Sequence, residues 1–181
     1  MLNKLKRLPV YLKNVSLLAL LWPAATVLRK TNRNYQHLWV VMERGFDARD
    51  NAYWFFRYLR EKQPQINSCY VIDKNSPDFE KVAKLGRTVS WRSLQHYLMY
   101  LSADMLISTH VQPVAPDLMA YYHLRQIGIH PRGKQIFLQH GIIKDEMMEV
   151  RARYADERRT EIVQAEGDIN LEDLIEKHHC V

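Results

Sequence analysis

The residues best suited to chemistry follow the apolar run Ile136–Gln139. His140 and Gly141 come directly after this run, and Lys144 follows three residues later. An apolar run ending in His-Gly is typical of a buried strand that turns sharply, because glycine adopts backbone conformations closed to other residues. Ligands of open α/β sheets bind beyond the carboxyl ends of the strands, and histidine titrates near neutral pH. We therefore predict His140 as a general base and Lys144 as a phosphate contact. A histidine held in a turn and an ordinary surface lysine are the alternatives.

Polar side chains follow two other apolar runs in the same way. His110 follows Met105–Ser108, and Glu43, Arg44 and Arg49 follow Leu38–Met42. We predict His110 as a second candidate catalytic residue, with a structural histidine as the alternative. Glu43, Arg44 and Arg49 are predicted to form a polar cluster that binds substrate phosphate. A buried ion-pair network that fixes the loop would explain them as well.

These residues need a scaffold, and the chain supplies one by alternating apolar runs with helical patterns. Helices are expected near 50–62, 76–86, 93–101 and 117–127, with Asp50 or Asn51, Ser76, Ser93 and Asp117 at their starts. The predicted strands are Leu38–Met42, Ser68–Ile72, Arg87–Ser90, Met105–Ser108 and Ile136–Gln139. Such alternation is typical of βαβ units. We predict an α/β fold with a single Rossmann-like parallel sheet of about five strands.

The sequence contains no signature of a cofactor or a metal. No GxGxxG or GxxxxGK[ST] motif follows a predicted strand, so we predict no cofactor. His178-His179-Cys180 are adjacent at the chain end and make poor chelating geometry, so we predict no metal. Cys69 lies in an apolar run and is expected to be a buried, inert thiol.

Charge divides the chain unevenly. Residues 1–144 carry 21 Lys and Arg against 9 Asp and Glu, whereas residues 145–181 carry 5 against 11. We divide the chain into residues 1–37, a basic and apolar membrane-associating segment, residues 38–145, a Rossmann-like domain, and residues 146–181, an acidic tail. The tail is expected to hold two polar helices, near 146–164 and 171–177.

The first 37 residues include seven basic residues and no acidic one. Their apolar block, Val15–Leu28, is too short to span a bilayer and contains Pro23. We predict an amphipathic helix on an anionic membrane surface, with Trp22 inserted. A helix packed on its own domain is the alternative. Nucleic acid would satisfy the charge, but no recognition motif supports it, so we predict no nucleic-acid partner.

Four spaced groups of residues resemble the CDP-glycerol glycerophosphotransferase family, the teichoic-acid polymerases and primases of bacterial envelopes. The resemblance covers roughly residues 38–145. The groups are Glu43-Arg44 with Ala48-Arg49-Asp50-Asn51 and Phe55-Phe56; Tyr70-Val71-Ile72-Asp73 with Ser76-Pro77-Asp78; Ala103-Asp104 with Ile107-Ser108-Thr109-His110; and Leu138-Gln139-His140-Gly141 with Lys144-Asp145. Their order and spacing together are more specific than any one group.

The resemblance implies the N-terminal, acceptor-side domain of a two-domain transferase of the GT-B type. It implies a mechanistically important histidine at His140, CDP-glycerol as donor and a lipid-linked, phosphate-bearing acceptor. The expected location is the cytoplasmic face of the membrane. The sequence departs from the family pattern after Asp145, so we expect a truncated form without the donor-binding domain. The alternative is a non-catalytic module that binds or scaffolds the acceptor at the membrane.

Overall fold

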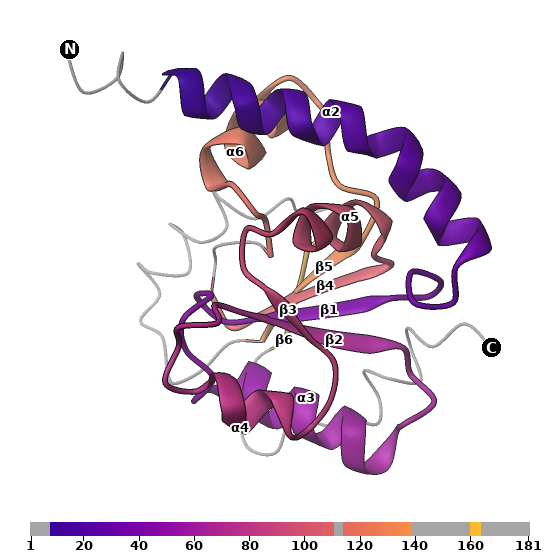
Figure 1. The fold of residues 1–181 in the computed structure, drawn as a ribbon, viewed down its shortest axis with the longest axis vertical. Coiled ribbons are helices and arrows are strands. Elements are labelled where there is room, and N and C mark those ends of the chain that lie inside the picture. Colours follow the sequence, from indigo (N-terminus) through magenta and orange to yellow (C-terminus); the bar gives the residue numbers. More distant parts are fainter. Residues whose placement is uncertain (1–7, 111–113, 139–159, 164–181) are drawn as a thin grey trace.

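The computed structural model describes residues 8–110, 114–138 and 160–163, which form a parallel sheet with helices on both sides (Figure 1). The strands are β1 (Trp39–Met42), β2 (Ser68–Ile72), β3 (Thr88–Ser90), β4 (Met105–Ser108), β5 (Lys134–Leu138) and β6 (Thr160–Val163). They pair in the order β3-β2-β1-β4-β5-β6 with every pair parallel. This is the strand order of a Rossmann sheet. The predicted α/β fold with a single Rossmann-like sheet is confirmed.

Two helical layers enclose the sheet and bury both of its faces (Figure 1). The layer above it in Figure 1 holds α2 (Leu8–Thr31), α5 (Leu94–Ser102) and α6 (Leu118–Gln126), and the layer below holds α3 (Asn51–Lys62) and α4 (Phe79–Ala83). Side chains alternate along β1, so that Val40 belongs to the upper core and Val41 to the lower one. Every residue of β1, β2 and β4 is buried, as expected for parallel strands covered on both faces.

Short polar side chains start three of the helices where the sequence predicts them. Asp50 accepts a hydrogen bond from the backbone N–H of Asn51 at the start of α3. Ser93 accepts one from His96 at 3.2 Å, and Asp117 accepts one from Ala120 at 2.6 Å. These caps satisfy amides that lack partners in the first turn of a helix.

Helix α2 packs on its own domain. Leu18 and Ala25 are buried in the upper core, and Trp22 is partly buried against it. Apolar side chains also lie on its exposed side, including Leu20 and Val27. One side of α2 is therefore packed on the domain, as the alternative prediction stated. Membrane contact by residues 1–37 stays a prediction. Among the described residues, no helix is long and apolar enough to cross a membrane.

Two predicted elements need correction. The predicted tail helix near 146–164 is wrong for its last residues, because Thr160–Val163 form β6 beside β5. The rest of the tail lies outside the described residues. The helix predicted to begin at Ser76-Pro77 instead begins at Phe79 after Asp78. Ser76 donates its hydroxyl hydrogen to the carbonyl of Phe46 and accepts the N–H of Asp78, so it ties two loops together instead of capping α4.

Candidate functional site

The candidate site lies where β1 and β4 end, because these strands are neighbours in the sheet. Met42 is in register with Ser108, so the residues after each strand emerge side by side. Arg44 Nε donates a hydrogen bond to His110 Nε2 at 2.6 Å, across 66 residues of sequence. The sheet thus brings two of the predicted site residues together.

The contacts of His110 orient its ring. Nε2 accepts from Arg44 and therefore carries no proton in this arrangement. The ring proton then lies on Nδ1, which is 3.1 Å from the hydroxyl oxygen of Thr109. The backbone N–H of His110 donates to the Ser108 hydroxyl at 3.1 Å. His110 is consequently an oriented imidazole beside an exposed guanidinium.

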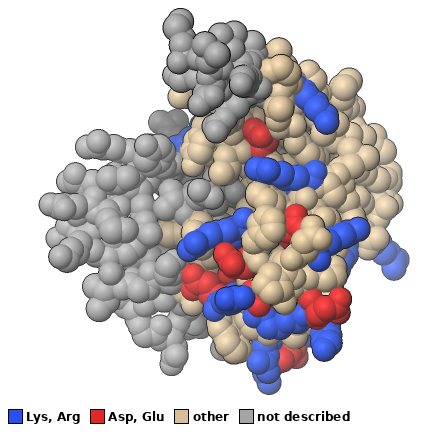
Figure 2. Space-filling view, turned by 60° about the vertical axis from the view of Figure 1, so that its left-hand side comes forward, with Lys and Arg blue, Asp and Glu red and all other residues tan. Residues whose placement is uncertain are grey.

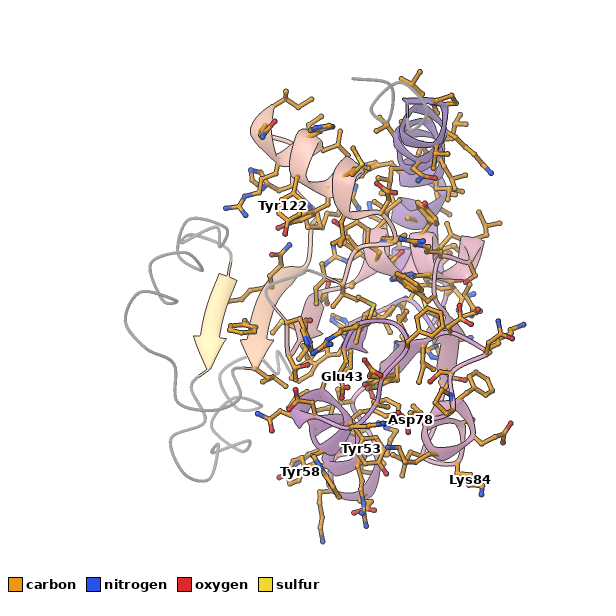
Figure 3. All side chains as sticks on the ribbon, turned by 90° about the vertical axis from the view of Figure 1, so that its left-hand side faces the viewer. Glu43, Tyr53, Tyr58, Asp78, Lys84 and Tyr122 are labelled. Carbon is orange, nitrogen blue, oxygen red and sulfur yellow. The ribbon has the colours of Figure 1, made fainter. Side chains whose placement is uncertain are left out.

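Glu43 has a different role from its neighbour Arg44. Its side chain is buried, and its carboxylate accepts the backbone N–H groups of Arg49 at 3.0 Å, Asp50 at 2.9 Å and Tyr53 at 3.2 Å. A carboxylate at a helix N-terminus satisfies unpaired amides and complements the helix dipole. Glu43 thus occupies the start of α3, where a phosphate would otherwise bind. Figure 3 shows Glu43 between the sheet and α3, near Tyr53.

Burial and this carboxylate act on the neighbouring Tyr70. Burial raises the pKa of the Tyr70 phenol, and the charge of Glu43 raises this pKa further. Tyr70 therefore stays protonated, and its hydroxyl donates to the carbonyl of Asp47 at 3.3 Å. It is a fixed support of the loop after β1.

The side chain of Arg49 forms an ion pair with Asp78. Its Nε donates to Asp78 at 2.8 Å. Burial opposes ionisation of Asp78, but the Arg49 hydrogen bond, the Ala48 N–H and Lys81 together lower its pKa. Lys81 also donates to the carbonyl of Ala48 and lies 4.2 Å from the Tyr53 ring centroid. These contacts fix the loop after β1 through an ion pair in which Asp78 is buried and Arg49 is exposed. Phosphate binding by Arg49 stays a prediction. Figure 3 shows Asp78 close to Tyr53.

A glycine allows the loop after β1 to turn beneath an aromatic ring. Gly45 has φ +88°, and a Cβ there would lie 2.7–2.9 Å from the Trp91 ring. Phe46 packs edge-on against the same ring, with centroids 5.5 Å apart. The guanidinium of Arg92 lies 4.1 Å from the Trp91 centroid. The loops after β1 and β3 are thereby packed together, which steadies Arg44 beside them.

His140, Lys144 and Asp145 lie outside the described residues, and their predicted roles remain predictions. His140 is two residues after Leu138, the last residue of β5, and β5 neighbours β4.

Two residues of the site were not singled out as site residues from sequence. Both Asp78 and Thr109 belong to the groups of residues that carry the family resemblance, but neither is predicted as a site residue. Asp78 follows a Ser-Pro pair after a strand, a pattern that also predicts a helix start, so sequence does not reveal its contact with Arg49. No group of three or more His, Cys, Asp or Glu within residues 8–110, 114–138 and 160–163 could hold a metal ion. Cys69 is buried, and burial raises its pKa to about 11.

The chain is similar to proteins of two kinds. It is 32% identical over 111 residues to the minor teichoic acid biosynthesis protein GgaB of Bacillus subtilis, covering 60% of this chain and 12% of GgaB. It is 52% identical over 40 residues to the DNA gyrase A protein of Clostridium acetobutylicum, and 46% identical over 43 residues to that of Mycobacterium tuberculosis. These stretches cover 22% and 24% of this chain and 5% of each gyrase protein.

The chain therefore spans about an eighth of GgaB and a smaller part of the gyrase proteins. A stretch of about 40 residues is shorter than a typical domain, so the gyrase similarity carries no function here. No protein-family model matches the chain, and no solved structure matches it.

Proposed function

We propose that this chain acts in teichoic acid synthesis as the acceptor-side domain of a glycerophosphotransferase. The reaction would transfer glycerol phosphate from CDP-glycerol to a lipid-linked acceptor at the membrane. The similarity to GgaB supports the pathway, and the motifs of the glycerophosphotransferase family support the reaction. The observation that carries the proposal is the Arg44–His110 contact at the carboxyl edge of a Rossmann-like sheet.

The geometry suits this chemistry in a definite way. In the reaction, an acceptor hydroxyl oxygen attacks phosphorus, the bond to CMP breaks, and a base removes the hydroxyl proton. Arg44 has an exposed guanidinium, a group that can bind phosphate oxygens through paired N–H groups. When a phosphate engages Arg44, Nε2 of His110 loses its donor and becomes available to accept the proton. Thr109 meanwhile orients the ring through Nδ1. His140, the base expected from sequence, is the other candidate for this role.

The test is CMP release from CDP-glycerol with lipid-linked acceptor in liposomes. His110→Gln and His140→Ala separate the two candidate bases, and loss of the true base is expected to slow release by about 10²–10⁴-fold. Arg44→Gln is expected to weaken phosphate binding. Arg57→Gln is the matched control, because Arg57 lies on α3 and pairs with Glu61 at 2.7 Å. Release that is insensitive to all three site variants would refute the proposed site.

A second function is favoured by the contacts of His110 as they stand. Nε2 accepts from Arg44, and Nδ1 lies beside Thr109, so the imidazole is arranged as a structural support for an anion-binding arginine. A non-catalytic module that binds a phosphate-bearing acceptor needs no more than this. Folded protein that binds the acceptor in an Arg44-dependent way, yet releases no CMP, would establish this second function.

A further inference from the structure

An apolar cavity of about 540 Å³ lies between α2, α5 and α6, in the layer opposite α3 and α4. This volume falls within the ~300–1,000 Å³ typical of ligand pockets. Most of the lining side chains are aliphatic, aromatic or proline. The lining residues are Val15, Leu18, Ala19, Trp22, Pro23, Tyr100, Leu101, Ala115, Pro116, Asp117, Tyr121, Leu124, Ile127, Ile129, His130 and Pro131.

Asp117, the acidic residue of the lining, already has hydrogen-bond partners within the protein. Asp117 accepts a hydrogen bond from Asn14 Nδ2 at 2.8 Å and another from the Ala120 N–H at 2.6 Å. The hydroxyl of Tyr121 donates to Gln135 at 3.0 Å. Because these polar groups have partners, the cavity offers a ligand mainly apolar surface.

Apolar side chains continue from the cavity to the outside. Ile127 and Ile129 line the cavity, yet 71% and 47% of their surfaces remain exposed. On α2, Ala19 of the lining is also exposed. These side chains belong both to the lining and to the exposed surface, so an apolar ligand can reach the cavity from outside.

The two segments that border the cavity are basic. Residues 8–37 contain four Lys and Arg, of which Arg29 pairs with Asp104, and residues 118–134 contain three. Neither segment contains Asp or Glu. Arg132 is held next to the cavity: its guanidinium lies 4.7 Å from the Trp22 ring centroid and donates to Thr26 Oγ1 at 2.7 Å. A ligand with an apolar part and an anionic part complements this arrangement.

Charge of both signs is concentrated elsewhere on the molecule. Figure 2 shows Lys, Arg, Asp and Glu crowded together on the lower part of the described surface, at the level of α3 and α4, and sparser at the level of α2. The layer that contains α2 is thus the less charged part of this view.

We propose that this cavity binds one hydrocarbon chain of an anionic phospholipid, with the lipid phosphate beside Arg132. Bilayer lipids supply both the apolar chain and the negative head group. In this mode α2 stays packed on the domain through Leu18 and Ala25, and a single lipid chain enters the protein. This proposal does not depend on the transferase reaction.

The test uses vesicles containing phosphatidylglycerol whose acyl chain carries a photoactivatable group. Crosslinked peptides are expected from residues 15–23 and 118–131, which include most of the cavity lining. Ala19→Trp fills the cavity and is expected to lower the adduct yield about tenfold or more, because the chain loses its buried site. Ser16→Trp is the matched control, since Ser16 is also exposed on α2 but does not line the cavity. Circular dichroism checks that both variants fold.

A second pair of variants tests the head group. Arg132→Gln is expected to weaken binding to phosphatidylglycerol vesicles by about fivefold, the effect of removing one basic residue near an anionic surface. Arg57→Gln, on α3, is expected to change nothing. Equal binding to phosphatidylcholine vesicles, adducts outside the cavity, or equal effects of Ala19→Trp and Ser16→Trp would each overturn the proposal. A dimer that Ala19→Trp dissociates, without lipid adducts in the unchanged protein, would show a self-association surface instead.

Discussion

Glu43 is a charged residue after a strand that stabilises the fold instead of facing a ligand. Its carboxylate accepts three backbone N–H groups at the start of α3. Glu43→Gln removes the charge and one acceptor oxygen, so it is expected to lower the free energy of unfolding by about 1.5–3 kcal/mol. Urea denaturation measures this difference. Glu61→Gln is the control, because Glu61 is exposed and pairs with Arg57 on the same helix. Equal effects of the two variants would contradict the role assigned to Glu43.

His96 is a second buried polar residue with a testable consequence. The ring is fully buried at the start of α5, and its Nδ1 accepts the N–H of Arg92 at 3.1 Å. Burial lowers the pKa of His96 to about 3; the backbone of Val114 opposes this shift, and the charge of Arg92 adds to it. The folded protein therefore keeps His96 neutral at pH values where the unfolded chain binds a proton.

The sign of the pH dependence follows from this difference. Stability from His96 is complete above the unfolded pKa of about 6.5 and falls as the pH drops toward 3, because the unfolded state gains a proton. Between pH 7 and pH 5 the expected loss is about 2 kcal/mol. Urea denaturation at both pH values should show this loss in the unchanged protein and a smaller one in His96→Asn. An identical loss in both proteins would assign the pH dependence to other groups.

For single residues, the sequence predicts which side chains lie at the edge of the sheet better than it predicts which side chains they contact. The positions of Arg44 and His110 after apolar runs placed both near the sheet edge, as the structure confirms. Their direct contact depends on β1 and β4 being neighbours although β2 and β3 lie between them in the chain. The role of Glu43 also depends on a fold-back, since the amides it binds come from the far side of a turn built around Gly45.

Among the elements, α2 carries the clearest test of packing. Leu18 is 7% exposed and Leu20 is 75% exposed on the same helix. Leu18→Ala is expected to cost about 2–5 kcal/mol, because it leaves a cavity in the upper core. Leu20→Ala is expected to change stability by no more than about 0.5 kcal/mol. Urea denaturation of both variants without membranes is the measurement. Small and equal effects would mean that α2 does not pack on the domain in solution.

Most elements were predictable from local signals, and the failures have physical causes. Ser68–Ile72 and Met105–Ser108 are strands with the predicted bounds, because continuous apolar runs suit doubly covered strands. β6 was missed because Thr160–Val163 lies in an acidic stretch and is defined by its pairing with β5. The start of α4 was misplaced because Ser76 bonds the loop after β1. Long-range pairing decided both cases.

β1 and β4 lie at the centre of the molecule, and this position predicts which strands unfold locally and which unfold only with the whole domain. These strands lie in the middle of the order β3-β2-β1-β4-β5-β6 and are buried throughout. β3 lies at one edge, has three residues and is buried only at Val89. Central, fully buried strands open only with global unfolding, whereas edge elements open locally at lower free energy.

Native-state hydrogen exchange tests this order. The ladder amides of β1 and β4 are expected to exchange with the free energy of global unfolding, and those of β3 with a smaller one. Low urea should therefore accelerate exchange in the central strands, where exchange requires exposure of the most surface, and leave β3 nearly unaffected. Gly45 links the two regions, because its turn packs beneath Trp91 directly after β3. If β3 is as protected as β1, that packing joins the edge to the core, and the site beside Arg44 opens only when the whole sheet unfolds.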